Sequence, residues 1–94
     1  MKGTEKQINW ASEIINRLDG VLDQIVTNIP DECPQEQKDM MSTFVEQLRS
    51  RIHGADYAGD IIDLFKNVKT PDNLMGMWRI TRPATPGQHK ILGR

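Results

Sequence analysis

Three aspartates, Asp56, Asp60 and Asp63, have the i, i+4, i+7 spacing that places side chains along one face of a helix. This row of carboxylates is the first candidate for chemistry, because hard cations such as Ca²⁺ bind oxygen ligands. Calcium takes roughly six to eight oxygens, some of them from a loop, and no EF-hand loop surrounds these residues. We therefore expect a solvated acidic face, with a divalent cation as the alternative. The same acids argue against a helix-turn-helix at Gly54, because they would begin its recognition helix and repel DNA.

The other reactive side chains are Cys33, His53 and His89. Cys33 precedes an expected helix N-terminus, where the helix dipole favours a reactive thiolate. A catalytic cysteine also needs a base, and His53 is expected at the far end of that helix while His89 lies in the C-terminal segment. We therefore expect an ordinary free thiol, and a His53 that suits a helix C-terminus. No phosphate loop, zinc spacing or nucleophile elbow is present, so the sequence predicts no enzyme, no cofactor and no metal site.

The C-terminal segment combines a tryptophan with four bases. Trp78 is followed by Arg79, Arg82, Lys90 and Arg94 without any acid, so residues 79–94 carry +4 and the preceding residues −5. We expect these five residues to form the contact region for a protein partner. The alternative is nucleic-acid binding through the basic tail, in which phosphate contacts would make the affinity salt-dependent.

Two tryptophans and four methionines could serve either a core or a binding surface. Trp10 and Trp78 are expected to pack in the core, although one of them could anchor a partner. Methionines fill gaps in thin cores more often than they form adaptable apolar surfaces, and both interpretations apply here. These methionines are Met40, Met41, Met75 and Met77.

Length and composition favour one helical domain. The chain has 94 residues, of which 37% are hydrophobic, 27% charged and only 5% aromatic. This is enough apolar material to fold, and the low aromatic content disfavours a sheet. The single cysteine and an N-terminus without an apolar signal segment predict a cytoplasmic protein. No apolar run approaches the roughly 20 residues of a membrane span, so we expect no membrane contact.

The first helix is predicted from Thr4 to about Asn28. Thr4 and Gln7 have the spacing of a capping box, and Gly20 is the position at which a bend is expected. Apolar residues recur every three or four positions, as on the buried face of a helix. That face comprises Ile8, Ala11, Ile15, Leu18, Leu22, Ile25 and Ile29, widened by Trp10, Ile14, Val21 and Val26.

Two more helices follow the connection between Pro30 and Pro34. Pro34 suits a first helical turn, and Gly54 suits the end of the second helix. The second helix is patterned by Met41, Phe44, Val45, Leu48 and Ile52. The third is patterned by Ala58, Ile61, Ile62, Phe65 and Val68.

A short fourth helix is expected after Thr70, which has the form of a cap before Pro71 and Asp72. It would run from Asn73 to about Trp78. The remaining residues contain two prolines and two glycines and are expected to be irregular, pinned by Ile80, Ile91 and Leu92. The sequence thus predicts an all-α protein, with a bundle of three main helices and a short fourth in residues 1–78 and a basic tail in residues 79–94.

The stretch GTEKQINWA resembles the N-termini of small proteins of bacterial phages and other mobile elements, which begin with GTEKQ, two further residues and Trp-Ala. The matching residues are Gly3 to Gln7, Trp10 and Ala11. The resemblance covers only about the first dozen residues and implies a small helical phage-type protein, with no catalytic residues to carry over. Its expected task is protein binding, for example as an inhibitor or modulator of a host protein such as a defence nuclease. A phage structural or assembly role, with self-association through the first helix, is a further alternative.

Overall fold

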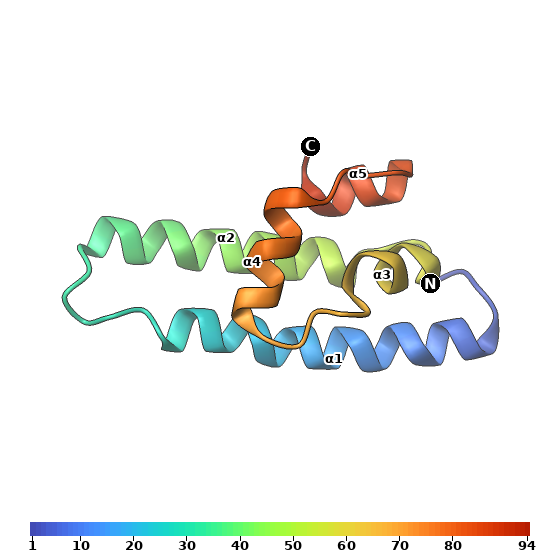
Figure 1. The fold of residues 1–94 in the computed structure, drawn as a ribbon, viewed down its shortest axis with the longest axis horizontal. Coiled ribbons are helices and arrows are strands. Elements are labelled where there is room, and N and C mark those ends of the chain that lie inside the picture. Colours follow the sequence, from blue (N-terminus) through green and yellow to red (C-terminus); the bar gives the residue numbers. More distant parts are fainter.

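The computed structural model describes residues 1–94, and its regular secondary structure is entirely helical (Figure 1). The predicted all-α class is therefore confirmed. The helices are α1 (Glu5–Thr27), α2 (Gln35–His53), α3 (Ala58–Phe65), α4 (Pro71–Ile80) and α5 (Pro86–Leu92). An isolated bridge between Lys2 and Tyr57 ties the N-terminal residues to the start of α3.

The capping box at the start of α1 is confirmed. The Gln7 amide donates to the Thr4 hydroxyl over 3.1 Å, and the Thr4 amide donates to the Gln7 side-chain oxygen over 3.0 Å. These two bonds satisfy donors that the first helical turn would otherwise leave free. From this cap α1 runs unbroken through Gly20 to Thr27.

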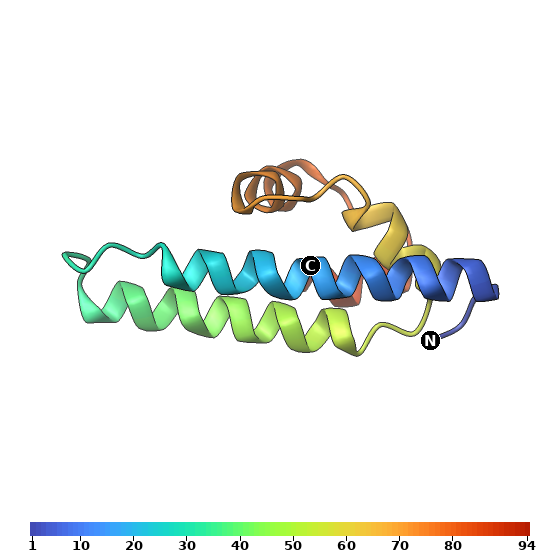
Figure 2. The same ribbon diagram turned by 90° about the horizontal axis from the view of Figure 1, so that it is seen from below.

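Helices α1 and α2 form a long antiparallel hairpin that sets the shape of the molecule, about 46 Å in its longest dimension (Figures 1 and 2). Helix α4 crosses one face of this hairpin steeply, near the middle of its length. Helix α3 packs against α1, and α5 contacts α2 and α3. The hairpin end around residues 28–34 therefore projects beyond the other three helices.

The core lies in the part of the molecule where all five helices meet. It joins six side chains of α1 with residues of α2, α3, α4 and α5, and no residue between Leu22 and Val45 is buried. The predicted widening of the α1 face by Trp10 and Val26 is wrong, because these side chains are 48% and 38% exposed. The rest of the apolar face of α1 packs mainly against α3 and α2.

The expectation of an irregular tail is wrong for residues 86–92, which form α5. The Thr85 hydroxyl caps this helix, Pro86 begins it, and Gly93 ends it with a left-handed backbone of φ +75° that suits glycine. Ile91 and Leu92 are buried in the common core, as expected, whereas Ile80 is 81% exposed. Helix α4 also extends to Ile80, so the boundary expected after residue 78 falls inside a helix.

No helix in the structure has both the length and the apolar character that a bilayer span requires.

Candidate functional site

An apolar groove lies between α2 and α4, on the side of the core toward the hairpin end. It has a volume of about 400 Å³, and five of its six lining residues are hydrophobic. Helix α2 contributes Gln37, Met40, Met41 and Phe44, and α4 contributes Met75 and Trp78. We call this feature the methionine groove.

Helical periodicity places these side chains together. The α2 residues follow the i, i+3, i+4, i+7 pattern and the α4 residues follow i, i+3, so each helix presents one row to the groove. Phe44 and Trp78, both lining residues, pack edge to face, with ring centroids 5.1 Å apart and an interplanar angle of 88°. Met40 forms an outer wall and is 68% exposed. The groove thus combines a packed aromatic pair with flexible methionine side chains.

The expected contact residues are only partly brought together. Trp78 belongs to the methionine groove, and the Arg94 guanidinium lies 5.2 Å from its ring centroid. Arg94 also donates to the carbonyl oxygens of Trp78 and Thr81, over 2.5 and 2.6 Å. Its side chain is therefore engaged in holding the chain end against the last turn of α4.

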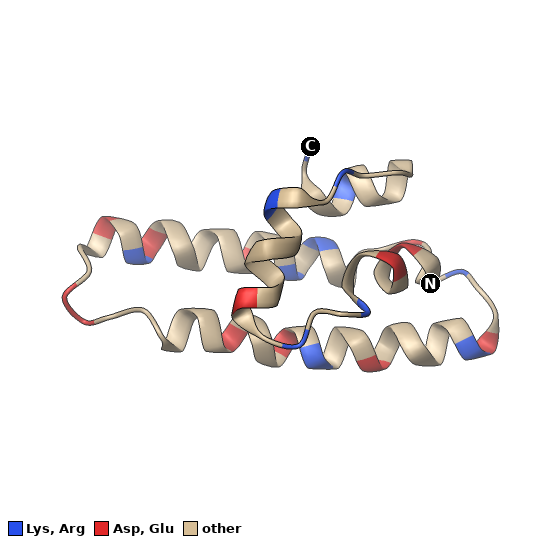
Figure 3. Ribbon diagram, in the orientation of Figure 1, with Lys and Arg blue, Asp and Glu red and all other residues tan.

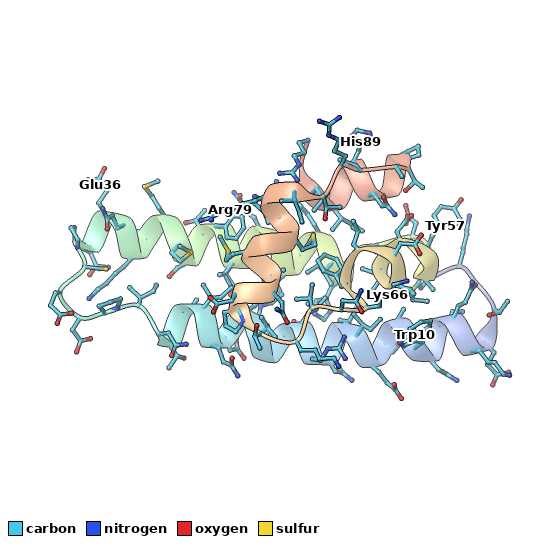
Figure 4. The ribbon with its side chains drawn as sticks, in the orientation of Figure 1. Trp10, Glu36, Tyr57, Lys66, Arg79 and His89 are labelled. Atoms are coloured by element: carbon cyan, nitrogen blue, oxygen red, sulfur yellow. The ribbon has the colours of Figure 1, made fainter.

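The other three predicted contact residues, Arg79, Arg82 and Lys90, are exposed and form no salt bridge. Figure 3 shows a lysine on α5, one charge of each sign on α4, and mainly Asp and Glu around the hairpin end. In Figure 4, Arg79 is labelled on α4 and Glu36 at the start of α2. The hairpin end is therefore predominantly acidic, whereas the rest of the molecule carries charges of both signs.

The row of three aspartates does not form a uniformly solvated face. Asp56 and Asp63 are exposed, but Asp60 is only 6% exposed and accepts a 2.8 Å hydrogen bond from the Thr85 hydroxyl. An ideal Cβ placed on Gly87 would lie 2.0 Å from the Asp60 Oδ2 atom. Asp60 thus fills the space beside the first turn of α5, and its burial corrects the prediction. The structure groups no three His, Cys, Asp or Glu side chains in a way that could hold a metal ion.

An ion-pair network that the sequence analysis missed links the two helices of the hairpin. Arg49 lies 2.9 Å from Asp19 and 2.5 Å from Asp23, and His53 lies 2.9 Å from Asp19. Desolvation lowers the pKa of Arg49, but the hydrogen bond to Asp23 and the charges of Asp23, Asp19 and Glu46 outweigh it, so the pKa is raised. The sequence contains one signal for this network: Asp19 and Asp23, and likewise Arg49 and His53, have the i, i+4 spacing that puts two side chains on the same face of a helix.

The cysteine and the histidines lie on different elements. Cys33 is a partly buried free thiol in the loop before α2. His53 occupies the last turn of α2, as predicted, at the opposite end of a helix about 28 Å long. His89 lies on α5, where its Nδ1 atom contacts the Arg94 carbonyl oxygen over 2.5 Å.

Comparison of the chain with protein-family models, with curated proteins and with solved structures finds no match.

Proposed function

We propose that this protein is a small protein-binding module that receives a helical segment of its partner in the methionine groove. The groove between α2 and α4 is the single observation that carries this proposal. Rows of side chains from two crossing helices border an open apolar groove, and a groove of this kind can accept the apolar face of a third helix. Phe44 and Trp78 provide the aromatic anchors that dominate binding energy at protein interfaces.

The exposure of the groove favours a protein partner over a small molecule. Small-molecule sites enclose most of their ligand, whereas the outer wall of this groove, Met40, is itself 68% exposed. Open surfaces walled by methionines instead adapt to the side chains of a partner protein, because the unbranched thioether changes rotamer easily.

Affinity capture with a matched variant tests the proposal. Met40→Gln/Met75→Gln keeps side-chain length at two incompletely buried positions but makes the groove walls polar. The N-terminal resemblance suggests a bacterial host protein as partner, so a bacterial lysate is the sample of choice. We expect a protein that the unaltered chain retains, that the double variant does not, and that binds with 1:1 stoichiometry in calorimetry once purified. Equal binding of that purified partner to both chains would contradict docking in the groove.

Nucleic-acid binding is a second candidate, favoured by the three exposed bases Arg79, Arg82 and Lys90, which have no acidic partner. Fluorescence anisotropy with short single- and double-stranded oligonucleotides tests it. Binding that weakens steeply with salt, and that Arg79→Gln/Arg82→Gln/Lys90→Gln abolishes, would support this function. No binding at low ionic strength would remove it.

A further inference from the structure

The charges around the methionine groove give its partner a definite chemistry. Residues 19–47, which comprise the hairpin end and the adjoining turns of α1 and α2, contain seven acids and one base and carry a net charge of −6. The rest of the chain, with six acids and eleven bases, carries +5. The net charge of −1 therefore conceals a strongly acidic end on one side of the groove (Figure 3).

Two of these acids lie directly at the groove. Glu36 and Asp39 line a shallow depression that shares Met40 and Phe44 with the methionine groove, so carboxylates border its apolar wall. Neither forms a salt bridge, and the side-chain amide of Gln35 donates to Asp39. On the other side of the groove, Asp72 lies about one helical turn before Met75 on α4.

Two of the other five acids in residues 19–47 are also free to act on a partner, because Asp19, Asp23 and Glu46 pair with Arg49. Asp31 and Glu32, in the connecting loop, form no salt bridge, and the single base, Lys38, donates to the backbone carbonyl of Asp31. The positive end of the α2 dipole offsets only about half an elementary charge. A partner that entered the groove with acidic flanks would therefore meet like charges, whereas basic flanks would be attracted.

We propose that the methionine groove binds a basic amphipathic helix, whose apolar side chains at i, i+3, i+4 and i+7 enter the groove while Lys and Arg on its borders face Glu36 and Asp39. This inference rests on the proposed function and specifies the partner's charge. Arg79 follows Trp78 on the α4 side of the groove and is itself a base. The α2 side, with Glu36 and Asp39, is therefore the side that attracts Lys and Arg of the partner.

Three fluorescein-labelled model peptides test the inference by anisotropy against the full chain. They share one amphipathic pattern of leucines on the apolar face and carry Lys, Gln or Glu at the flanking positions. We expect the Lys peptide to bind at least about tenfold more tightly than the Gln peptide, with the Glu peptide weakest. The difference should shrink as salt rises from about 0.01 M to about 0.15 M, because the screening length falls from about 30 Å to about 8 Å.

Two charge-matched variants separate recognition at the groove from general attraction. Glu36→Gln/Asp39→Gln and Asp56→Asn/Asp63→Asn each remove two exposed acids, but only the first pair borders the groove. We expect the first variant to lose most of the preference for the Lys peptide and the second to change affinity less than about twofold. Equal losses in both variants would overturn the inference.

The remaining outcomes distinguish this inference from the proposed function. Equal binding of the Lys and Gln peptides, abolished by Met40→Gln/Met75→Gln, would leave groove docking intact and overturn the charge preference. Peptide binding that the methionine variant leaves unchanged would overturn both. A dimer in sedimentation that the methionine variant dissociates would identify a second copy of this chain as the occupant, and would also overturn the inference.

Discussion

At the scale of single residues, Asp60 and Gly87 show how closely α5 approaches α3. The Asp60 carboxylate is buried, held by the Thr85 hydroxyl, and leaves no space for a side chain at Gly87. Gly87→Ala should therefore cost about 1–3 kcal/mol of unfolding free energy, because the new methyl group must displace a short, buried carboxylate. Urea unfolding followed by circular dichroism measures this change.

Gly20→Ala is the matched control for that substitution. Gly20 lies inside α1, and a Cβ there meets nothing within 4 Å. The same change should therefore stabilise the protein by roughly 0.5–1 kcal/mol through the higher helix propensity of alanine.

The double variant Gly87→Ala/Asp60→Ala should lose less unfolding free energy than the two single variants lose together, since removing the Asp60 carboxylate removes the clash. Strict additivity would contradict the close contact.

Arg49 is the second residue whose role depends on its neighbours. It spans Asp19 and Asp23, two carboxylates one helical turn apart, a geometry that the forked guanidinium matches and a lysine ammonium does not. Arg49→Lys should therefore cost about 0.5–1 kcal/mol, the upper range for partly exposed ion pairs. Urea unfolding should show that loss shrinking at high salt, whereas Arg79→Lys, at an exposed site without an acidic partner, should change nothing.

The raised pKa of Arg49 also fixes the sign of its pH dependence. A base whose pKa is higher in the folded state stabilises the fold fully below its ordinary pKa, and loses that contribution only as the pH rises above it. Arg49 therefore remains charged throughout the neutral range.

At the scale of elements, α5 decides whether the C-terminal segment is an arm or part of the fold. Ile91 is buried against the common core while its neighbour Lys90 is exposed. Ile91→Ala should cost about 2–4 kcal/mol by leaving a cavity, and Lys90→Ala should stay within about 0.5 kcal/mol. Thermal and urea unfolding compare the two. Similar small effects of both changes would mean that α5 does not share the core.

The helices that the sequence predicted best are those with long periodic patterns or explicit caps. The start of α1 followed from Thr4 and Gln7, and the start of α4 from Thr70 and Pro71. The same threonine-proline signal stands at the start of α5, but the surrounding prolines and glycines favoured an irregular interpretation. The error shows that in a short segment a cap carries more information about the helix than the composition of its neighbours.

The methionine groove could be predicted only in part. From the sequence, its methionines were candidates for an adaptable surface and Trp78 for the contact region, although packing in the core was favoured for methionines and tryptophans alike. Pattern within one helix cannot say which partner covers a face, and here α4 crosses the hairpin so that it covers Phe44 and leaves Met40 exposed. The buried Asp60 and the Arg49 network were missed for the same reason, because their partners lie about 25 to 30 residues away in the chain.

At the scale of the whole molecule, the fold has a packed end and an open end. The five helices meet around one core, but the hairpin end consists of two helices and a loop without a buried residue between Leu22 and Val45. Residues 19–47, which include this end, carry a net charge of −6 and border the methionine groove. Low burial and mutual repulsion of acids both weaken that end, so it should open without global unfolding.

Native-state hydrogen exchange should therefore show a gradient along the hairpin. Backbone amides of residues 24–43 should have smaller opening free energies than those of residues 11–22 and 45–52, whose side chains include the core of α1 and α2. Amides in the core should open only with global unfolding, so their opening free energy should equal the value from urea unfolding. Exchange measured at two pH values verifies that opening is an equilibrium, and uniform protection along both helices would contradict the gradient.

If a basic helix docks on this end, exchange of residues 36–43 should slow selectively when the Lys peptide binds, because the docked helix stabilises the closed hairpin by mass action.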